Sequence, residues 1–413
     1  MKGLHILILG FVLLQSCEKY PLARVYRVQV LAGNTRHDGV RDTTVHTEDE
    51  PFARVQDTAV YVSAVSVPQT YNWRRDTSYG GVTCELLLFK NGDLVQSFKT
   101  GESACISAAA QTHHLLGGHL YTEYINGQET VICRDGTEII RYTGREILRG
   151  LLVAEDGVYT LGLDRDEGGF AYRKDGGVLI RQNNCTVFGD FNNSACGSTG
   201  ALYYNDGSIF FCFRTASACY YVRDSQLNQA SSPVGAARLL DFRVFGRDLY
   251  FVADYMNTKI VYAPKRNYIL PALFPWTDAS LLCMNGEVWV IAGSSGSGGT
   301  LCCRIEDLPS AGTGAVFPGS DNFIYPLEQS TYAVGYSRGN LRVQDSGGQI
   351  LFARDSSYYF GRACAAGAGR DFYVLVTPRE EGSPPFVWHG GKRDVYDING
   401  YLTAIEVEIS LPS

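Results

Sequence analysis

One motif recurs about every forty residues along most of the chain and limits the folds that the sequence can adopt. In each copy, two short strand-like segments flank a polar turn. The copies lie at 86–98, 130–142, 170–182, 219–231, 259–271, 300–312, 341–353 and 385–397. The clearest turns are Asn91-Gly92, Asp135-Gly136 and Asp175-Gly176. Both residues of such pairs tolerate positive φ, so each copy is predicted to be a β-hairpin.

A further strand-like segment precedes every hairpin and carries an aromatic residue near its start. These aromatic residues are Tyr61, Tyr121, Tyr159, Phe210, Tyr250, Trp289, Tyr332 and Tyr373. Segments rich in small and aliphatic residues come before it, at 104–110, 147–154, 238–246, 280–286 and 361–369. Small side chains suit a strand at the crowded axis of a ring. Each unit therefore predicts four antiparallel strands, which together form one blade of a β-propeller.

We therefore predict an all-β chain that folds as a single β-propeller over residues 51–413. Eight units indicate eight blades of four antiparallel strands. Seven blades is the alternative if one weak unit is an insertion. No segment sustains the 3.6-residue periodicity of an amphipathic helix, which argues against a helical repeat.

The C-terminal segment 401–410 is predicted to close the ring. It alternates between two faces, as a half-buried strand does. One face holds the aliphatic residues Ile405, Val407 and Ile409. Because the first unit has no innermost segment of its own, we expect this strand to pair there, beside the strand that contains Val60 and Val62. The segment 20–33 competes for the same place.

The first residues predict export and a lipid anchor. Residues 1–16 form a predicted signal peptide, because the apolar run over 3–14 is shorter than the roughly 20 residues of a membrane-spanning helix. The run ends in Leu14-Gln15-Ser16-Cys17, and a small residue directly before Cys is typical of a bacterial lipobox, although Gln15 departs from the usual pattern. Cys17 is therefore predicted to carry a lipid, with 17–50 as anchored segment and tether. The alternative is an ordinary signal peptide with a chance Cys.

The residue after Cys17 bears on location. Glu18 stands where an Asp would retain a lipoprotein at the inner membrane. We therefore expect an exported protein that is lipid-anchored to the outer membrane, on either its periplasmic or its cell-surface side.

The N-terminus and the hairpins together resemble the β-propeller lipoproteins common in the Bacteroidota. Blades in that family carry an aromatic strand followed by a hairpin of the type W-K-N-G. The matching copies here are Phe89-Lys90-Asn91-Gly92, Cys133-Arg134-Asp135-Gly136 and Arg173-Lys174-Asp175-Gly176. The resemblance covers roughly residues 55–400 and implies the architecture, but it carries no catalytic residues.

Composition and spacing argue against several classes of function. A net charge of −7 with scattered Lys and Arg does not suit a nucleic-acid partner. The adjacent His113-His114 would point to opposite faces of a strand, and the twelve Cys lack zinc-site spacing, so neither a metal nor a cofactor is expected. Asp164, Asp166 and Glu167 could supply a pair of catalytic carboxylates, but three acids in one turn are typical of a solvated loop.

The long connections at one face of the ring are the predicted ligand-binding surface. Their aromatic and Arg residues are Tyr71, Trp73, Arg74, Arg75, Tyr79, Trp276, Tyr358 and Tyr359. Exposed aromatic rings beside Arg are typical of interfaces. These features favour a binding or scaffold role for an envelope protein or glycan, with a glycoside hydrolase or lyase as the alternative. The rings could instead pack over the blade edges.

Replacing the predicted lipid attachment site tests the anchor. Cys17→Ala removes the sulfur that a lipid would occupy, so the protein should leave the membrane fraction or stay unprocessed. Cell fractionation followed by blotting measures this. A processed form of the variant that stays in the membrane would refute the lipobox.

Overall fold

The computed structural model describes most of the chain from residue 58 to residue 409. Within this range it leaves out 76–80, 100–112, 155, 165–168, 189–200, 206, 234–237, 274–275, 285–286, 295–298, 309–314, 319–321, 328–330, 338–339, 355–356, 359–364 and 369–370. The predicted signal peptide, Cys17 and the tether therefore lie outside the described residues.

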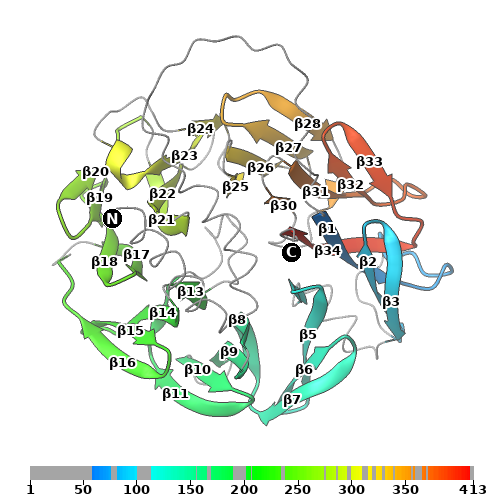
Figure 1. Ribbon diagram of the computed structural model, residues 1–413, viewed down its shortest axis with the longest axis horizontal. Helices are drawn as coiled ribbons and strands as arrows, with labels where there is room; N and C mark the ends of the chain where they lie inside the picture. Colours follow the sequence, from blue (N-terminus) through cyan, green and yellow to red (C-terminus); the bar gives the residue numbers. More distant parts are fainter. Residues whose placement is uncertain are drawn as a thin grey trace, which may run out of the picture.

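Eight antiparallel sheets stand around a common axis, as Figure 1 shows, so the predicted eight-bladed propeller is confirmed. From the axis outward, blade 1 contains β34 (Gly400–Ile409), β1 (Thr58–Ser66), β2 (Glu85–Lys90) and β3 (Asp93–Lys99). Blade 2 contains β4 (His113–Leu116), β5 (His119–Asn126), β6 (Glu129–Arg134) and β7 (Thr137–Thr143). Blade 3 contains β8 (Glu146–Ala154), β9 (Gly157–Asp164), β10 (Gly169–Lys174) and β11 (Gly177–Asn183).

The next three blades continue the order of the chain. Blade 4 contains β12 (Thr186–Val187) and β13 (Tyr203–Asn205), which both pair with β14 (Ser208–Arg214), and then β15 (Cys219–Arg223) and β16 (Gln226–Ala230). Blade 5 contains β17 (Arg238–Phe245), β18 (Asp248–Tyr255), β19 (Thr258–Tyr262) and β20 (Asn267–Ile269). Blade 6 contains β21 (Trp276–Met284), β22 (Glu287–Ser294), β23 (Gly299–Arg304) and β24 (Ala315–Pro318).

The last two blades complete the ring. Blade 7 contains β25 (Asn322–Pro326), β26 (Thr331–Ser337), β27 (Asn340–Asp345) and β28 (Ile350–Arg354). Blade 8 contains β29 (Ser357–Tyr358) and β30 (Ala365–Ala368), which both pair with β31 (Asp371–Pro378), and then β32 (Phe386–His389) and β33 (Lys392–Val395). The described residues include one 3-10 turn, η1 (Ile305–Asp307), and no helix able to cross a membrane.

Two ends of the blades are distinguished below. The bottom is the end that carries the turns between third and fourth strands, such as Asn91-Gly92. The top is the opposite end, where the second strand connects to the third and one blade leads to the next.

The predicted hairpin turns fasten three strands together at the bottom. The φ angle is 52° at Asn91, and its side-chain Oδ1 accepts a hydrogen bond from Val60 N at 2.8 Å, while Asn91 N donates to Val60 O. The same pair of bonds joins Asp135 to Leu120, Asp175 to Val158 and Asp224 to Ile209. Asn and Asp suit this place because they tolerate positive φ and carry a short acceptor.

In these four blades, the aromatic residue of the second strand lies directly after the fastened position. Register places it opposite the last residue of the third strand, which is often basic. The pairs are Tyr61 with Lys90, Tyr159 with Lys174 and Phe210 with Arg223. The cations stand 5.2, 5.3 and 5.8 Å from the ring centroids. The recurring aromatic residue and the recurring Lys or Arg before the turn are therefore one cross-strand contact.

The hydrophobic core lies mainly between neighbouring blades. Between blades 3 and 4, the ring of Phe170 meets Phe211 and Phe213 edge to face, with centroids 5.1 and 4.8 Å apart. Tyr172 packs in the same cluster and is fully buried. Aromatic residues from adjacent sheets thus hold the blades face to face.

The C-terminal strand closes the ring as predicted. β34 is the innermost strand of blade 1 and pairs along the whole of β1, with Val62 opposite Ile405 and Val60 opposite Val407. Ile405 and Val407 are buried against blade 8, in a cluster that includes Leu375. Blade 1 is therefore built from both ends of the described chain.

One sequence-based assignment was wrong, and another falls on residues that the structure does not describe. In blade 2 the described innermost strand is β4, which contains His113 and His114, and the predicted inner segment 104–110 lies outside the described residues. The hairpin expected over 300–312 ends after its first strand, because η1 follows β23 directly and the outer strand forms later, as β24. That segment has no Asn-Gly or Asp-Gly pair to reverse the chain at once.

Removing residues 401–413 should destabilise the whole ring. The deletion exposes the inner edge of β1 and uncovers the apolar face of blade 8. Burial of the Ile405 and Val407 side chains alone contributes about 1.5–3 kcal/mol each to the stability of the folded state. We expect a lower midpoint of urea unfolding and aggregation measured by light scattering. Deleting only 411–413, which lie beyond β34, is the control. An unchanged midpoint for the longer deletion would contradict the closure.

Candidate functional site

The predicted ligand loop, the connection from β1 to β2, has its Trp inside the protein. Trp73 is only 1% exposed, and its ring centroid lies 5.2 Å from that of Tyr401 in β34. Val65 and Leu86 belong to the same cluster. The indole therefore holds the loop down on blade 1 rather than offering a surface to a ligand.

The two Arg residues of this loop reach across to blade 8. Arg74 Nη2 donates a hydrogen bond to Ser383 O at 2.8 Å, and its Nε donates to Pro378 O at 3.3 Å. The guanidinium of Arg74 also lies 4.5 Å from the centroid of the Trp73 ring. Arg75 pairs with Glu381 at 2.9 Å. The loop is thus fixed to two blades at the point where the ring closes.

The outer surface of this junction is polar and open to solvent. The side chains of Arg75 and Glu381 are 77% and 63% exposed, and Asn72 Nδ2 also donates to Glu381 at 2.9 Å. Beside them Arg354 pairs with Glu380 at 2.9 Å. A backbone hydrogen bond and this Arg lower the pKa of Glu380, so its carboxylate keeps its charge in mild acid.

The other predicted residues come from several blades. Tyr71 is half-buried against blade 1, and its carbonyl accepts a hydrogen bond from Asn399 Nδ2 at 3.1 Å. Trp276 begins β21 in blade 6, is 6% exposed and donates its Nε1–H to Pro271 O at 2.6 Å. Tyr358 lies in β29 of blade 8, opposite Thr377. Tyr79 and Tyr359 lie outside the described residues.

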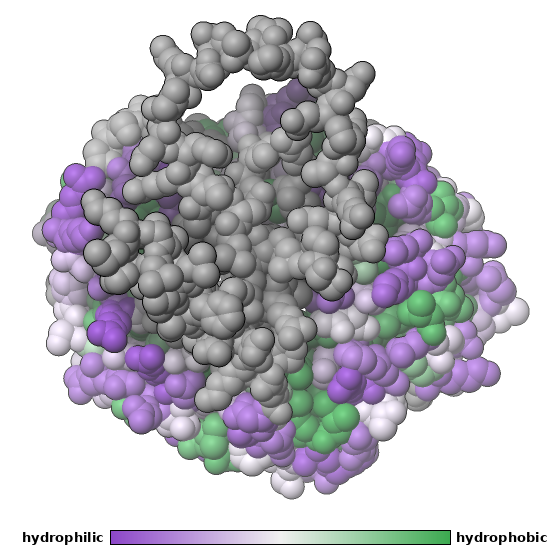
Figure 2. All heavy atoms as spheres, in the orientation of Figure 1, coloured by the Kyte–Doolittle hydropathy of each residue, from purple (hydrophilic) through white to green (hydrophobic). Residues whose placement is uncertain are grey.

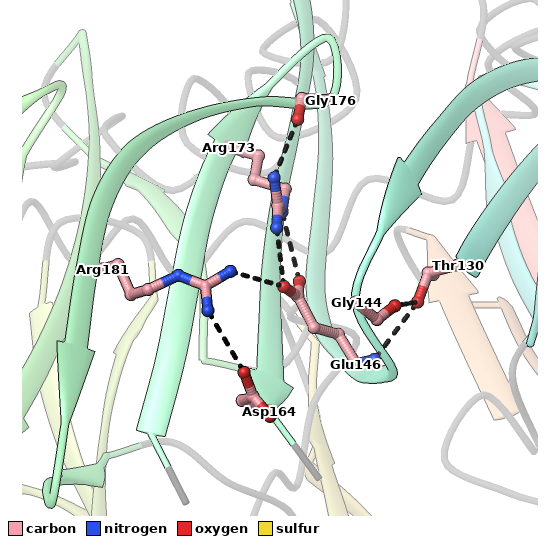
Figure 3. Close-up of polar contacts among 7 residues, drawn as sticks. All are labelled: Thr130, Gly144, Glu146, Asp164, Arg173, Gly176 and Arg181. Atoms are coloured by element: carbon pink, nitrogen blue, oxygen red, sulfur yellow. Dashed lines mark hydrogen bonds and ion pairs between the residues drawn. The ribbon is translucent and has the colours of Figure 1, made fainter. Parts of the chain in front are cut away.

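A buried ionic cluster between blades 2 and 3 was not found from the sequence. Glu146 begins β8 and its side chain is fully buried, as is nearly all of Arg173 from β10. Arg173 Nη2 and Nε donate to the two carboxylate oxygens at 2.8 and 3.3 Å, which is a bidentate pair (Figure 3). Thr130 of blade 2 accepts from Glu146 N at 3.1 Å and so ties the pair to the neighbouring blade.

Arg181 extends this cluster toward solvent. Its Nη2 lies 3.6 Å from Glu146, and its Nη1 lies 3.3 Å from Asp164 at the end of β9 (Figure 3). Asp164 was a candidate catalytic carboxylate; the other two acids of that turn lie outside the described residues. Because Glu146 is fully buried, it does not reach a substrate, and the Glu146–Asp164 pair is not an accessible acid–base pair.

Glycine and Tyr residues shape the space around Glu146. A side chain on Gly162 would place its Cβ 2.9 Å from the Cβ of Glu146, so only glycine leaves room for this carboxylate. Tyr142 stacks under Arg173, with the guanidinium carbon 4.0 Å from the ring centroid. Burial, reinforced by Glu146, raises the pKa of Tyr142, so the phenol remains neutral.

The sequence signal for this cluster was weak. Glu146 and Arg173 lie far apart in the chain, and each reads as an ordinary strand residue. The one local hint is that Arg173 lies inside the otherwise apolar segment FAYRK. In the structure this segment is buried at every position except its last. A buried charge requires a partner, but a single sequence does not name it.

Comparisons with known proteins assign no family to this chain. No protein-family model and no curated protein matches the sequence. Among solved structures, AztD from Citrobacter koseri has a TM-score of 0.45 and 11% identity, over 86% of this chain and 100% of AztD. A puromycin-hydrolysing peptidase from Mycobacterium tuberculosis has a TM-score of 0.40 and 10% identity, over 72% of this chain and 54% of the peptidase. Similarity at this level transfers no activity to this chain.

Replacing Glu146 should cost far more stability than replacing its exposed partner. Glu146→Ala leaves Arg173 buried without its carboxylate, which should lower the free energy of unfolding by about 3–5 kcal/mol. Arg181→Ala, the control, should cost about 1 kcal/mol or less, because its side chain is partly exposed. Urea unfolding followed by circular dichroism measures both. An equal loss in the free energy of unfolding for both variants would show that the buried Glu146–Arg173 pair stabilises the protein no more than the exposed contact does.

Proposed function

We propose that this protein is an exported, lipid-anchored binding protein that uses the propeller as a rigid scaffold. Its top face, where blades 1 and 8 meet, binds an envelope protein or glycan. The observation that carries this proposal is the fixed position of the 67–75 connection across the blade boundary. Trp73 anchors it from inside, and Arg74 bonds two carbonyls of blade 8.

Such fixation supports recognition rather than mere closure. A surface held in one conformation loses little entropy when it binds a partner. Above the anchored residues, Arg75, Asn72 and Glu381 present two charges and an amide to solvent in a defined arrangement. Polar groups of this kind suit hydrogen bonding to a glycan or to the rim of a protein interface.

Export is supported by one further feature of the described residues. Cys84, beside β2, is disulfide-bonded. Disulfides persist mainly in oxidising compartments such as the bacterial periplasm and the cell surface. This agrees with the signal peptide and lipobox in the sequence, with Cys17 as the lipidated residue and the outer membrane as the destination.

Removing the exposed pair at the junction should weaken binding without unfolding the ring. Arg75→Ala combined with Glu381→Ala deletes two solvent-exposed side chains, so stability should change by about 1 kcal/mol or less. In a pull-down from envelope extract and on a glycan array, the soluble protein should capture a partner that the double variant loses. Lys392→Ala, an exposed cation in the outer strand of blade 8, is the control.

Two outcomes would contradict this proposal. If the double variant and the wild type captured the same partner, the junction of blades 1 and 8 would not be part of the binding surface. Turnover of a glycan by the wild-type protein would favour the carbohydrate-active alternative instead.

A further inference from the structure

The outermost strands carry exposed aliphatic side chains on seven of the eight blades. We name these residues the apolar collar: Leu94, Val95, Ile139, Val178, Leu179, Leu227, Ile269, Ile350, Leu351 and Val395. Each is more than a third exposed, and Ile269 and Val395 reach 64% and 60%. Figure 2 shows apolar patches interrupting the polar surface near the outer edge of the ring.

The collar lies at the same end of the outer strand in each of these seven blades. Each member lies within the first four residues of its outer strand, directly after the bottom turn. At a rise of about 3.3 Å per residue, this is within roughly 13 Å of the turn. Since the blades repeat around one axis, equivalent positions lie on a circle at the bottom rim. A single globular partner would touch one or two blades, whereas a flat surface can approach the whole circle.

The chain enters the propeller at this same end. Thr58, the first residue of β1, pairs with Ile409, and Val60 is bonded to Asn91 in the bottom turn of blade 1. The residues that lead back to Cys17 therefore leave from the bottom. The segment between Cys17 and Thr58 has about forty residues and can span up to about 130 Å. It is therefore long enough to let the ring contact a membrane in which Cys17 is anchored.

Basic side chains stand between the collar and the turns. Lys90, Arg134, Lys174 and Arg223 each end a third strand at the bottom. These cations are paired within the rim: Lys90, Lys174 and Arg223 lie over the aromatic rings described above, and Lys174 also pairs with Asp156. The carboxylates of Asp135, Asp175 and Asp224 lie in the same turns, so the rim carries both signs of charge. Aliphatic side chains interspersed with charges of both signs match the boundary between acyl chains and zwitterionic headgroups.

We propose that the apolar collar rests on the surface of a bilayer with zwitterionic headgroups, with the bottom of the propeller toward the membrane. The proposal rests on the lipid anchor of the proposed function, which it extends by giving the ring an orientation. The junction of blades 1 and 8 at the top then faces away from the membrane, toward its partner.

Vesicle flotation of the unlipidated mature chain, residues 18–413, tests this orientation. The probe is vesicles of phosphatidylethanolamine with phosphatidylcholine. Leu94→Asp combined with Leu179→Asp puts two charges into the collar and should lower the bound fraction at least about tenfold. The matched control is Tyr255→Asp with Met256→Asp, two residues that are 48% and 82% exposed in the β18–β19 turn at the top. The control should bind as wild type does.

A second measurement does not depend on the stability of the collar variant. A polarity-sensitive dye on Leu94→Cys should shift to the blue when vesicles are added, and the same dye on Met256→Cys should not. Equal binding by the two double variants, or equal dye shifts, would overturn the proposal. So would a dimer in light scattering that the collar variant converts to a monomer, because a second copy would then cover the collar.

This result is independent of the anchor. The protein used carries no lipid, so loss of vesicle binding does not bear on Cys17. Conversely, release of Cys17→Ala from cells leaves the vesicle result unchanged. Failure of the orientation and failure of the lipid anchor are therefore distinguishable.

Discussion

The innermost strands impose the main physical constraint on this molecule. Each pairs within its sheet on one side only, and an unpaired backbone N–H in a buried position is costly. Side chains from the preceding blade supply acceptors: Glu123 for Leu148 N, Tyr203 for Val244 N, Asp241 for Leu281 N and Thr377 for Leu402 N, at 2.8–3.3 Å. At these four boundaries the blades are therefore joined by directional bonds as well as by packing, and a side chain of one blade completes the innermost strand of the next.

A ring joined in this way must close on itself. β34 does so from both sides: Leu402 N bonds to blade 8, and the carboxylate of Glu406 accepts from Gly117 N and Gly118 N of blade 2 at 3.0 Å each. Glu406 is half-buried at this closure, and its burial raises the pKa of the carboxylate. The 67–75 connection covers the same closure at the top.

The sequence predicted most of the architecture because its signals are local. Turn pairs such as Asn91-Gly92 and the alternation around Ile405 depend on neighbouring residues, and both predictions were confirmed. The site depended on long-range contacts. Trp73 was predicted as a surface ring, yet its main aromatic neighbour is Tyr401, from the far end of the chain. The Glu146–Arg173 pair depends on the space above Gly162, which no local pattern reveals.

Hydrogen–deuterium exchange along β34 tests ring closure most directly. If this strand completes blade 1, the amides of residues 402–407 should exchange as slowly as those of β1, since both would open only when the ring opens. Rapid exchange of 402–407, at the rate of an unstructured peptide while β1 and the hairpins of the other blades stay protected, would contradict the closed ring.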